Sequence, residues 1–295
     1  MIPQYRELNR GMSLDQFKTI YWWEWSHRVL ARLVGAAFLL PFLIFLWCGW
    51  IAPPLRLRLW TIFGAGVFLG GVGWWMVSSG LSERTSVSQY RLAFHLTLTC
   101  AIFAAIVWTS QQVLPRVAAQ APPRMRYRAM TLAGLILLQI YLGALVAGLD
   151  AGMSFNTWPL IDGAFVPAAD RLWFETPLWR NFFENALMVQ FNHRVVAYAI
   201  WLLAMIHAGD ALINNADPRT KRQALLVAVL VTLQAALGIV TLLEVSPLGL
   251  SLAHQGFAIV LLTVAVSHAE HLRDRFELHS LGKMSAIRAT AGNEP

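Results

Sequence analysis

The sequence predicts an all-α polytopic membrane protein built from two pseudo-symmetric helical bundles. Three observations support this prediction: an apolar composition, seven apolar stretches of bilayer length, and two histidine pairs at similar spacing. Apolar residues make up 57% of the 295 residues, and charged residues make up 13%. In a typical soluble domain about a quarter of all residues are charged, so this composition favours an integral membrane protein.

The seven apolar stretches follow one another along most of the chain, and each reaches the roughly 20 residues that a membrane helix needs. We expect helices at 22–49, 57–79, 92–114, 128–149, 187–212, 222–243 and 251–270. This gives three helices and then four, whereas a complete duplication would give four plus four. We therefore expect one further helix, similar to 128–149, ahead of Met1.

The duplication and the composition together predict three parts of the chain. We expect an N-terminal half at 1–115, a C-terminal half at 116–272 and a loose charged tail at 273–295. Before the first span, residues 1–20 are expected to form a polar arm. The long connection at 150–186 carries several Trp and Phe residues, which are typical of a belt at the membrane interface; a cap over a ligand site is the alternative.

Basic residues gather in alternate connections, and this pattern predicts the orientation. The segment 114–128 contains four arginines and no acid, while 150–186 is acid-balanced. The positive-inside rule then places the N-terminus of this chain outside and its C-terminus in the cytoplasm. Because the net charge of +7 is spread over short loops, no nucleic-acid partner is predicted. Cys48 and Cys100 lie within helices, so we expect core residues and no disulfide framework.

Four histidines form two pairs near the outer ends of the predicted helices. His27 and His95 are 68 residues apart, and His193 and His254 are 61 residues apart. A histidine in a membrane helix is costly and usually marks function. Two facing histidines in a helical bundle can bind a haem iron from both sides. Haem is favoured over zinc or copper because acids and thiols are scarce nearby, although a single such histidine can also be a packed, hydrogen-bonded residue.

The remaining histidines lie near or beyond the inner ends of the predicted helices. For them we expect a solvated or structural role. They are His207, His268, His271 and His279.

Glu24 distinguishes the first half from the second. It precedes His27 by three residues and so shares a helical face with it, whereas the matching residue before His193 is Gln190. A carboxylate beside a ligand histidine can orient the ring or move protons; an acid at a helix start is the plainer alternative.

Two arginines directly follow a histidine, Arg28 after His27 and Arg194 after His193. The planar guanidinium suits the propionates of haem, and snorkelling or interhelical pairing is the alternative. Several glycines in the predicted helices are expected to let neighbouring helices approach closely. They are Gly70, Gly71, Gly73, Gly134, Gly143 and Gly148.

A set of motifs resembles the haem A synthase family, in the class shared by mitochondria and many Gram-negative bacteria. The resemblance runs from about residue 4 to about residue 270, and its motifs are specific only as a set. They are Glu24-Trp-Ser-His27-Arg28, the glycine- and tryptophan-rich run 73–81, Tyr90-Arg-Leu-Ala-Phe-His95, Asn192-His193-Arg194 and Ala253-His254-Gln255. The first helix of the family's eight has no counterpart in this sequence.

The resemblance implies an oxidoreductase that acts on a methyl group, with two related halves of four helices. Such an enzyme oxidises the methyl on ring carbon 8 of haem O to a formyl group and so supplies haem A to cytochrome oxidase. His27, His95 and Arg28 would bind the substrate haem, and Glu24 would be the catalytic acid. His193, His254 and Arg194 would hold a haem b cofactor.

The resemblance also implies a reaction course and a location. Two successive hydroxylations would give a geminal diol that loses water, with Glu24 moving protons and haem b relaying electrons. The location would be the bacterial inner membrane. The partners would be haem O synthase and cytochrome oxidase assembly factors, and a homo-oligomer is allowed.

Two other classes of protein remain open on the residues alone. The first is a diheme cytochrome b-type electron carrier, which the four histidines allow but the Glu24/Gln190 asymmetry disfavours. The second is a transporter with inverted repeats. Both histidine pairs are predicted at one membrane face, so the repeats are parallel, and midplane charges are lacking.

Overall fold

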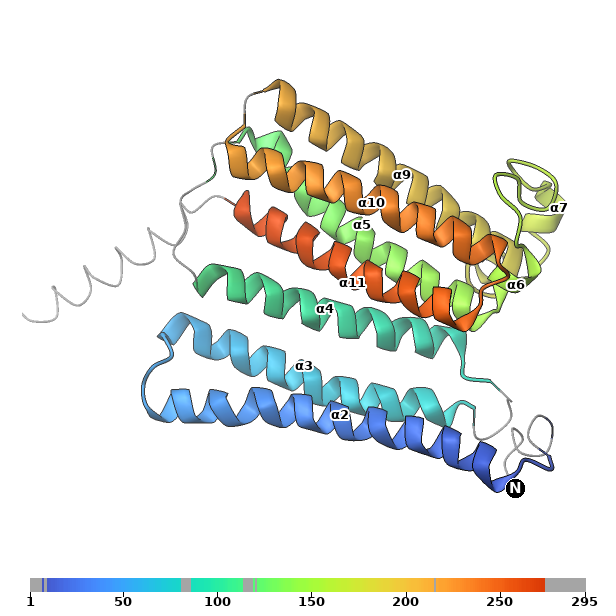
Figure 1. Ribbon diagram of the computed structural model, residues 1–295, viewed down its shortest axis with the longest axis horizontal. Coiled ribbons are helices and arrows are strands. Elements are labelled where there is room, and N and C mark those ends of the chain that lie inside the picture. The colour runs from blue at the N-terminus through green and yellow to red at the C-terminus, as the bar shows by residue number, and fades with distance from the viewer. Residues whose placement is uncertain are drawn as a thin grey trace, which may run out of the picture. The chain divides into compact units, whose positions relative to one another are not determined.

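The computed structural model describes residues 7, 10–80, 86–113, 119, 121–214 and 216–273 (Figure 1). Within these ranges every regular element is a helix, apart from an isolated bridge between Ile161 and Ala164. Seven of the described helices are long and apolar enough to cross a membrane, which confirms the predicted class. They are α2 (Leu14–Trp47), α3 (Pro53–Ser78), α4 (Gln89–Val113), α5 (Pro123–Gly148), α9 (Ala186–Ile213), α10 (Pro218–Leu243) and α11 (Leu248–His271).

The first long helix, α2, starts earlier than the sequence pattern indicates. Ser13 caps it: its hydroxyl accepts from the Gln16 backbone N–H at 3.3 Å, and the Gln16 side chain accepts from the Ser13 N–H at 3.0 Å. This reciprocal capping box satisfies two backbone donors, so helix formation begins at Leu14. Residues 14–20, expected in a polar arm, are therefore helical. The expected helix ahead of Met1 stays a prediction.

Proline and aspartate define the starts of other long helices. α3, α5 and α10 each have a proline at the first helical position, where the missing N–H costs nothing. Asp217 caps α10, because its carboxylate accepts from the backbone N–H groups of Arg219 and Thr220 at 3.1 and 3.0 Å. These local signals explain why the helix starts lie within a few residues of the predicted ones.

The connection between α5 and α9 is an ordered structure of short helices. These are α6 (Ala151–Ser154), α7 (Ala169–Leu172), η1 (Leu178–Arg180) and α8 (Asn181–Glu184). Two buried asparagines organise it. The Asn181 amide donates to the Glu175 and Leu178 carbonyls, and the Asn185 amide donates to the Arg171 carbonyl at 2.9 Å. Its aromatic residues, including Trp158, Trp173 and Trp179, are partly exposed, and their role in an interfacial belt stays a prediction.

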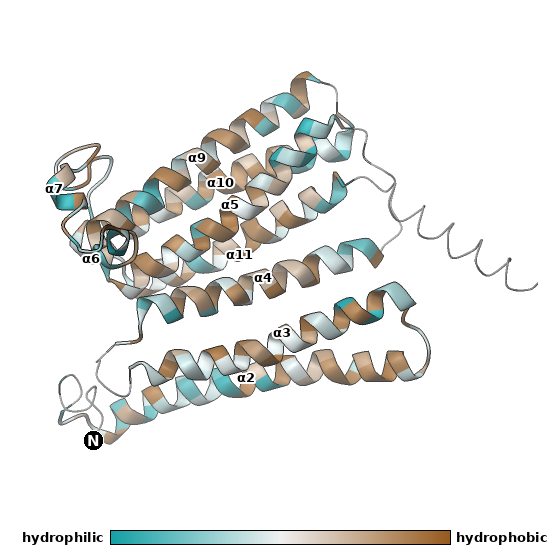
Figure 2. Ribbon diagram, turned by 180° about the vertical axis from the view of Figure 1, so that it is seen from behind, coloured by the Kyte–Doolittle hydropathy of each residue, from teal (hydrophilic) through white to brown (hydrophobic). Residues whose placement is uncertain are grey.

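The long helices expose large apolar side chains along their length, as expected where lipid is the solvent. Figure 2 shows these hydrophobic stretches, with hydrophilic residues more frequent towards the helix ends. The α2–α3 hairpin is held by aromatic contacts, with Phe42 against Trp60 at 4.9 Å between ring centroids. Cys100 is buried, Cys48 is exposed, and both are free thiols.

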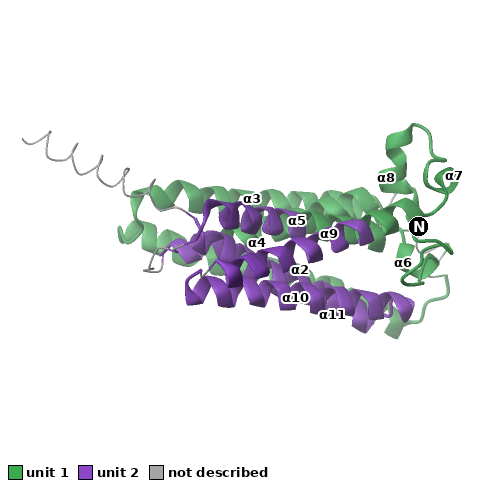
Figure 3. Ribbon diagram, turned by 90° about the horizontal axis from the view of Figure 1, so that it is seen from above, with its two compact units in different colours: residues 1–106, 138–193 green, residues 107–137, 194–295 purple. Residues whose placement is uncertain are grey.

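Contacts divide the chain into two compact units, coloured separately in Figure 3. Unit 1 comprises residues 1–106 and 138–193, and unit 2 comprises 107–137 and 194–295. Their boundaries fall inside α4, α5 and α9, so the units follow local packing and do not follow the sequence duplication. The division into halves at 1–115 and 116–272 stays a prediction, and the tail from 274 onwards lies outside the described residues.

Candidate functional site

His27 and His95, the first predicted pair, both belong to unit 1. His95 lies in the first two turns of α4 and is partly buried, whereas His27 lies on α2 and is exposed. On α3, Gly73 faces His95: a Cβ at Gly73 would stand 3.2 Å from Cε1 of the ring. The ring of His95 therefore occupies space that a side chain at position 73 would need.

His193 on α9 is held by two residues of α5. A Cβ on Gly143 would stand 3.2 Å from Cε1 of His193. The Gln139 amide nitrogen lies 3.1 Å from Nδ1 and 3.3 Å from Nε2 of the ring. The same nitrogen donates to the His193 carbonyl at 2.9 Å. Gln139 thus contacts both the backbone and the side chain of this histidine.

His254 on α11 has the same surroundings, built from α10. A Cβ on Gly238 would stand only 2.8 Å from Cε1 of His254. The Gln234 amide nitrogen lies 3.2 and 3.4 Å from the two ring nitrogens and donates to the His254 carbonyl at 3.0 Å. A glutamine and a glycine four residues apart therefore surround a histidine in both places.

Three helix hairpins share one register. Gly73, Gly143 and Gly238 each lie five residues before the last residue of their helix, and each faces a histidine near the start of the next long helix. Gly73 and Gly143, expected to let neighbouring helices approach closely, each make room for a histidine ring of a neighbouring helix. No signal in the sequence indicates this contact, because Gly73 precedes His95 by 22 residues and Gly143 precedes His193 by 50.

The other glycines singled out in the sequence behave differently. A Cβ at Gly70, Gly71 or Gly134 would meet nothing within 4 Å, so these residues do not mark a close helix contact. Gly148 does mark one, since a Cβ there would lie 2.9 Å from the Cα of Gln89. Close approach between helices was thus correctly expected at Gly148.

Glu24 and Gln190 occupy matching sequence positions but different environments. Glu24 is exposed on α2 and forms an ion pair with Arg28 at 3.2 Å, one turn along the helix. Gln190 is 3% exposed, and its amide reaches the Phe155 carbonyl at 3.5 Å. Arg194 is 8% exposed, whereas the Arg28 side chain is 59% exposed. The two halves therefore differ in charge and in burial beside their histidines.

The short helices are tied to α4 beside the His95 motif. The Tyr90 hydroxyl donates to the Glu184 carboxylate at 2.6 Å. Arg180 also donates to Glu184, and this contact raises the pKa of Arg180. The Tyr90 ring packs on Phe183 at 5.8 Å between centroids. Sequence reasoning had assigned no contact to Tyr90, because its partner is 94 residues away.

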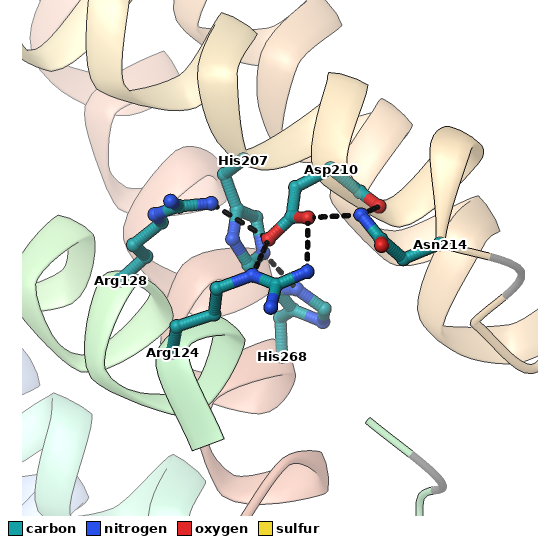
Figure 4. Close-up of polar contacts among 6 residues, drawn as sticks. All are labelled: Arg124, Arg128, His207, Asp210, Asn214 and His268. Carbon is teal, nitrogen blue, oxygen red and sulfur yellow. Dashed lines mark hydrogen bonds and ion pairs between the residues drawn. The ribbon is translucent and has the colours of Figure 1, made fainter. Parts of the chain in front are cut away.

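Outside the two motif pairs, another pair of histidines, His207 and His268, lies near the C-terminal ends of α9 and α11 (Figure 4). We call it the inner pair. His207 and His268 are 0% and 1% exposed, and their Nε2 atoms are 2.7 Å apart. Nδ1 of His268 lies 3.3 Å from the amide oxygen of Gln223. A solvated role for these two residues and for the buried His271 is therefore excluded, and the structural alternative holds for the bonded pair. His279 lies outside the described residues.

An ion-pair cluster lies beside this inner pair. Asp210, one turn from His207 on α9, accepts from Arg124 twice at 2.9 Å and from Arg128 at 2.7 Å. Figure 4 shows both arginines converging from α5 on this carboxylate. The side chain of Asp210 is only 10% exposed, so the bidentate contact compensates its loss of water. These contacts anchor α5 to α9.

The spacing of the His207–His268 pair fits a shared proton. A bond from imidazole nitrogen to a metal is about 2 Å long, so two nitrogens on one metal lie about 3 Å apart at a right angle and about 4 Å apart when opposite each other. At 2.7 Å, one Nε2 donates a hydrogen bond to the other. Among the described residues, no group of three or more His, Cys, Asp or Glu side chains could hold a metal ion.

Three of the four motif histidines, His95, His193 and His254, have surroundings that fit an additional bound group. Three buried polar atoms beside them make no hydrogen bond within the part of the chain that the structure describes: Nδ1 of His95, Oε1 of Gln139 and Oε1 of Gln234. A buried acceptor or donor without a partner is costly. An imidazole that binds a haem iron through Nε2 carries a proton on Nδ1, and this N–H needs an acceptor. The unpaired amide oxygens of Gln139 and Gln234 are such acceptors, so these residues fit a haem.

The chain is similar to proteins of known name over most of its length. A model of the COX15-CtaA family, described as cytochrome oxidase assembly protein, matches residues 1–266. A "Heme A synthase" of Bradyrhizobium diazoefficiens is 57% identical over 274 residues, covering 93% of this chain and 76% of that protein. Another, of Rhodopseudomonas palustris strain BisB18, is 62% identical over 265 residues, covering 90% and 72%. The family match includes all four motif histidines.

Proposed function

Because the chain belongs to the COX15-CtaA family of cytochrome oxidase assembly proteins, we propose that it is a haem A synthase. It oxidises the methyl group on ring carbon 8 of haem O to a formyl group, as an oxidoreductase of the inner membrane. The observation that carries this proposal is 57% identity to a protein of that name over 93% of this chain. The four histidines within the matched residues support it.

The N-terminal half binds the substrate. His27 and His95 bind the iron of haem O, and the contact of His95 with Gly73 supports its part in this site. Glu24 lies one turn from His27 and takes up the protons that leave during methyl oxidation. Arg28 pairs with Glu24 at 3.2 Å and is also suited to a haem propionate. Substrate binding at Arg28 would therefore release the Glu24 carboxylate for proton transfer.

The C-terminal half holds a haem b through His193 and His254, with Arg194 beside the first. When bound, this haem supplies one-electron transfer away from the substrate site. Gly143 and Gly238 support the assignment, because each leaves room for one of these rings. Gln190, buried in the place of Glu24, offers no acid and fits a site without proton chemistry. A diheme electron carrier is not favoured.

The charge pattern orients the chain in the membrane. Arg124 and Arg128 at the start of α5 belong to a connection without acids, which places this end in the cytoplasm. The N-terminus of this chain and the four motif histidines are then on the outer side, and the C-terminus is inside. Haem O synthase and cytochrome oxidase assembly factors are the expected neighbours, because they supply the substrate and receive the product.

The test is haem analysis of cells that lack their own haem A synthase but make haem O. Expression of the chain should yield haem A, and Glu24→Gln should leave haem O or a hydroxylated haem while retaining haem b. Glu244→Gln, at the C-cap of α10, is the matched control and should behave as wild type. Failure of the wild-type chain to make haem A would overturn the function. Normal haem A in Glu24→Gln would overturn only the role of Glu24.

A further inference from the structure

Two glutamines of the C-terminal half each bury an acceptor that has no use in the described structure. Oε1 of Gln139 and Oε1 of Gln234 make no hydrogen bond among the described residues. Their amide nitrogens are used, since each donates to a histidine carbonyl, at 2.9 and 3.0 Å. This contact fixes the amide beside the ring and leaves its oxygen available. The same arrangement occurs twice, on α5 and on α10.

Iron binding creates the donor that such an oxygen needs. An imidazole that binds iron through Nε2 carries a proton on Nδ1. That N–H almost always donates to a carbonyl, a carboxylate or water, which orients the ring and raises its basicity. The ring nitrogens of His193 and His254 already lie within 3.1–3.4 Å of the amides. The Nδ1–H of an iron-bound ring would therefore lie beside an amide whose oxygen makes no hydrogen bond among the described residues.

The α3–α4 hairpin shares the glycine but not the glutamine. Gln139 and Gln234 lie four residues before Gly143 and Gly238, and the residue four before Gly73 is Leu69. Nδ1 of His95 is buried and makes no hydrogen bond within the described residues. In the substrate half, Gly73 therefore leaves room for the ring of His95, but residue 69 provides no side-chain oxygen to accept its Nδ1–H.

We propose that Gln139 and Gln234 are positioning residues that accept the Nδ1–H of His193 and His254 and so keep haem b resident. Leu69 withholds this acceptor from His95, so the haem in the substrate half leaves after the reaction. This inference rests on the proposed function, because it assumes one resident and one exchanging haem. On this inference, the residue four positions before the glycine decides whether the haem stays bound as a cofactor or leaves as a product: glutamine retains it and leucine does not.

A purely structural role for the glutamines makes a different prediction. If their bond to the histidine carbonyl only joins two helices, Gln→Leu lowers the thermal midpoint and leaves haem exchange in the folded protein unchanged. The inferred role instead changes how fast haem b leaves. Gln223→Leu is the matched control, because Gln223 also contacts a buried histidine, His268, at a level that holds no haem.

The experiment measures transfer of haem b from the purified full-length chain in detergent to excess apomyoglobin. Gln139→Leu and Gln234→Leu should each speed the loss about 10–100-fold, the usual effect of removing such a partner. Gln223→Leu should lose haem b at the wild-type rate. Rates equal to wild type in Gln139→Leu and Gln234→Leu, or an equal acceleration in Gln223→Leu, would overturn the inference.

The reverse variant keeps the test decisive if the Gln→Leu variants fold poorly. Leu69→Gln adds the missing acceptor, so haem O or haem A should leave the substrate half about tenfold more slowly and copurify in larger amount. Unchanged retention would contradict the role of Leu69. The assay does not require haem A synthesis: a chain that makes no haem A but loses haem b faster in Gln139→Leu would refute the function and support the positioning role.

Discussion

α9 carries two histidines, and α11 carries two at matching positions as well as His271 at its last residue. The matching histidines near the two ends of these helices have different contacts. His193 and His207 are fourteen residues apart, and so are His254 and His268. Fourteen residues make about four helical turns, so both histidines of a helix lie on one face. Near the C-terminal ends the two histidines bond to each other, at 2.7 Å. Near the N-terminal ends each histidine lies against the preceding long helix.

The neighbouring residues explain this difference. At the C-terminal level both rings are buried, they bond to each other, and Gln223 contacts His268. At the other level, Gly143 and Gly238 provide space and Gln139 and Gln234 provide an unused acceptor. Two features therefore distinguish the proposed haem-binding histidines from the inner pair: a glycine beside the ring and an amide oxygen without a hydrogen bond among the described residues.

The largest expected effect is the loss of haem b when a ligand is removed. His193→Ala or His254→Ala should abolish the low-spin bis-histidine spectrum of the purified chain, because one axial bond cannot be replaced. His207→Ala should retain that spectrum wherever the protein folds. An absorption spectrum of the reduced protein measures both. A full bis-histidine spectrum in His254→Ala would break the comparison.

A smaller loss is expected when space beside the ring is filled. Gly238→Ala would put a Cβ 2.8 Å from Cε1 of His254, so the ring must move, and haem b occupancy should fall about tenfold. Gly143→Ala, at 3.2 Å from His193, should have a weaker effect. Gly256→Ala on α11 meets nothing within 4 Å and is the control. The measurement is the amount of haem b per purified protein in each variant. Equal amounts in all three variants would contradict the proposed role of the glycines.

The inner pair should affect stability and leave haem b in place. His207→Leu or His268→Leu leaves the other ring buried without its partner, at a cost of about 1–3 kcal/mol. The double variant removes both polar groups and should recover most of that loss. Thermal unfolding in detergent, followed with the haem b spectrum, provides the measurement. A double variant as unstable as the sum of the singles would show that the two rings contribute independently, which would contradict a bonded pair.

The smallest effect is expected at the edge of the ion-pair cluster. Arg124→Gln removes one partner of Asp210, but Arg128 remains at 2.7 Å, and the Arg124 side chain is 50% exposed. The thermal midpoint should fall less than in either single histidine variant, and less at high salt, where exposed ion pairs are screened. Asp210→Asn, which removes the negative charge that faces both arginines and one of the two acceptor oxygens, should lower it further. A larger drop for Arg124→Gln than for Asp210→Asn would disprove this ranking.

The sequence by itself determined the class of the protein, its seven long helices and the four motif histidines. Apolar stretches about 20 residues long must become helices in lipid, because every backbone polar group has to be satisfied within the segment. Local capping then shifted only the ends, as Ser13 and Gln16 do for α2. The repeated spacing of His27 and His95, and of His193 and His254, was visible without any coordinates.

Only the tertiary structure decided what each histidine touches. Gly73, Gly143 and Gly238 look like packing glycines in the sequence, and their contact with a ring depends on the rotation of two helices about their axes. Hydrophobic patterning constrains that rotation weakly here, because lipid-facing and buried residues are both apolar. For the same reason the bond between His207 and His268, 61 residues apart, could not be predicted: it depends on the packing of α9 against α11.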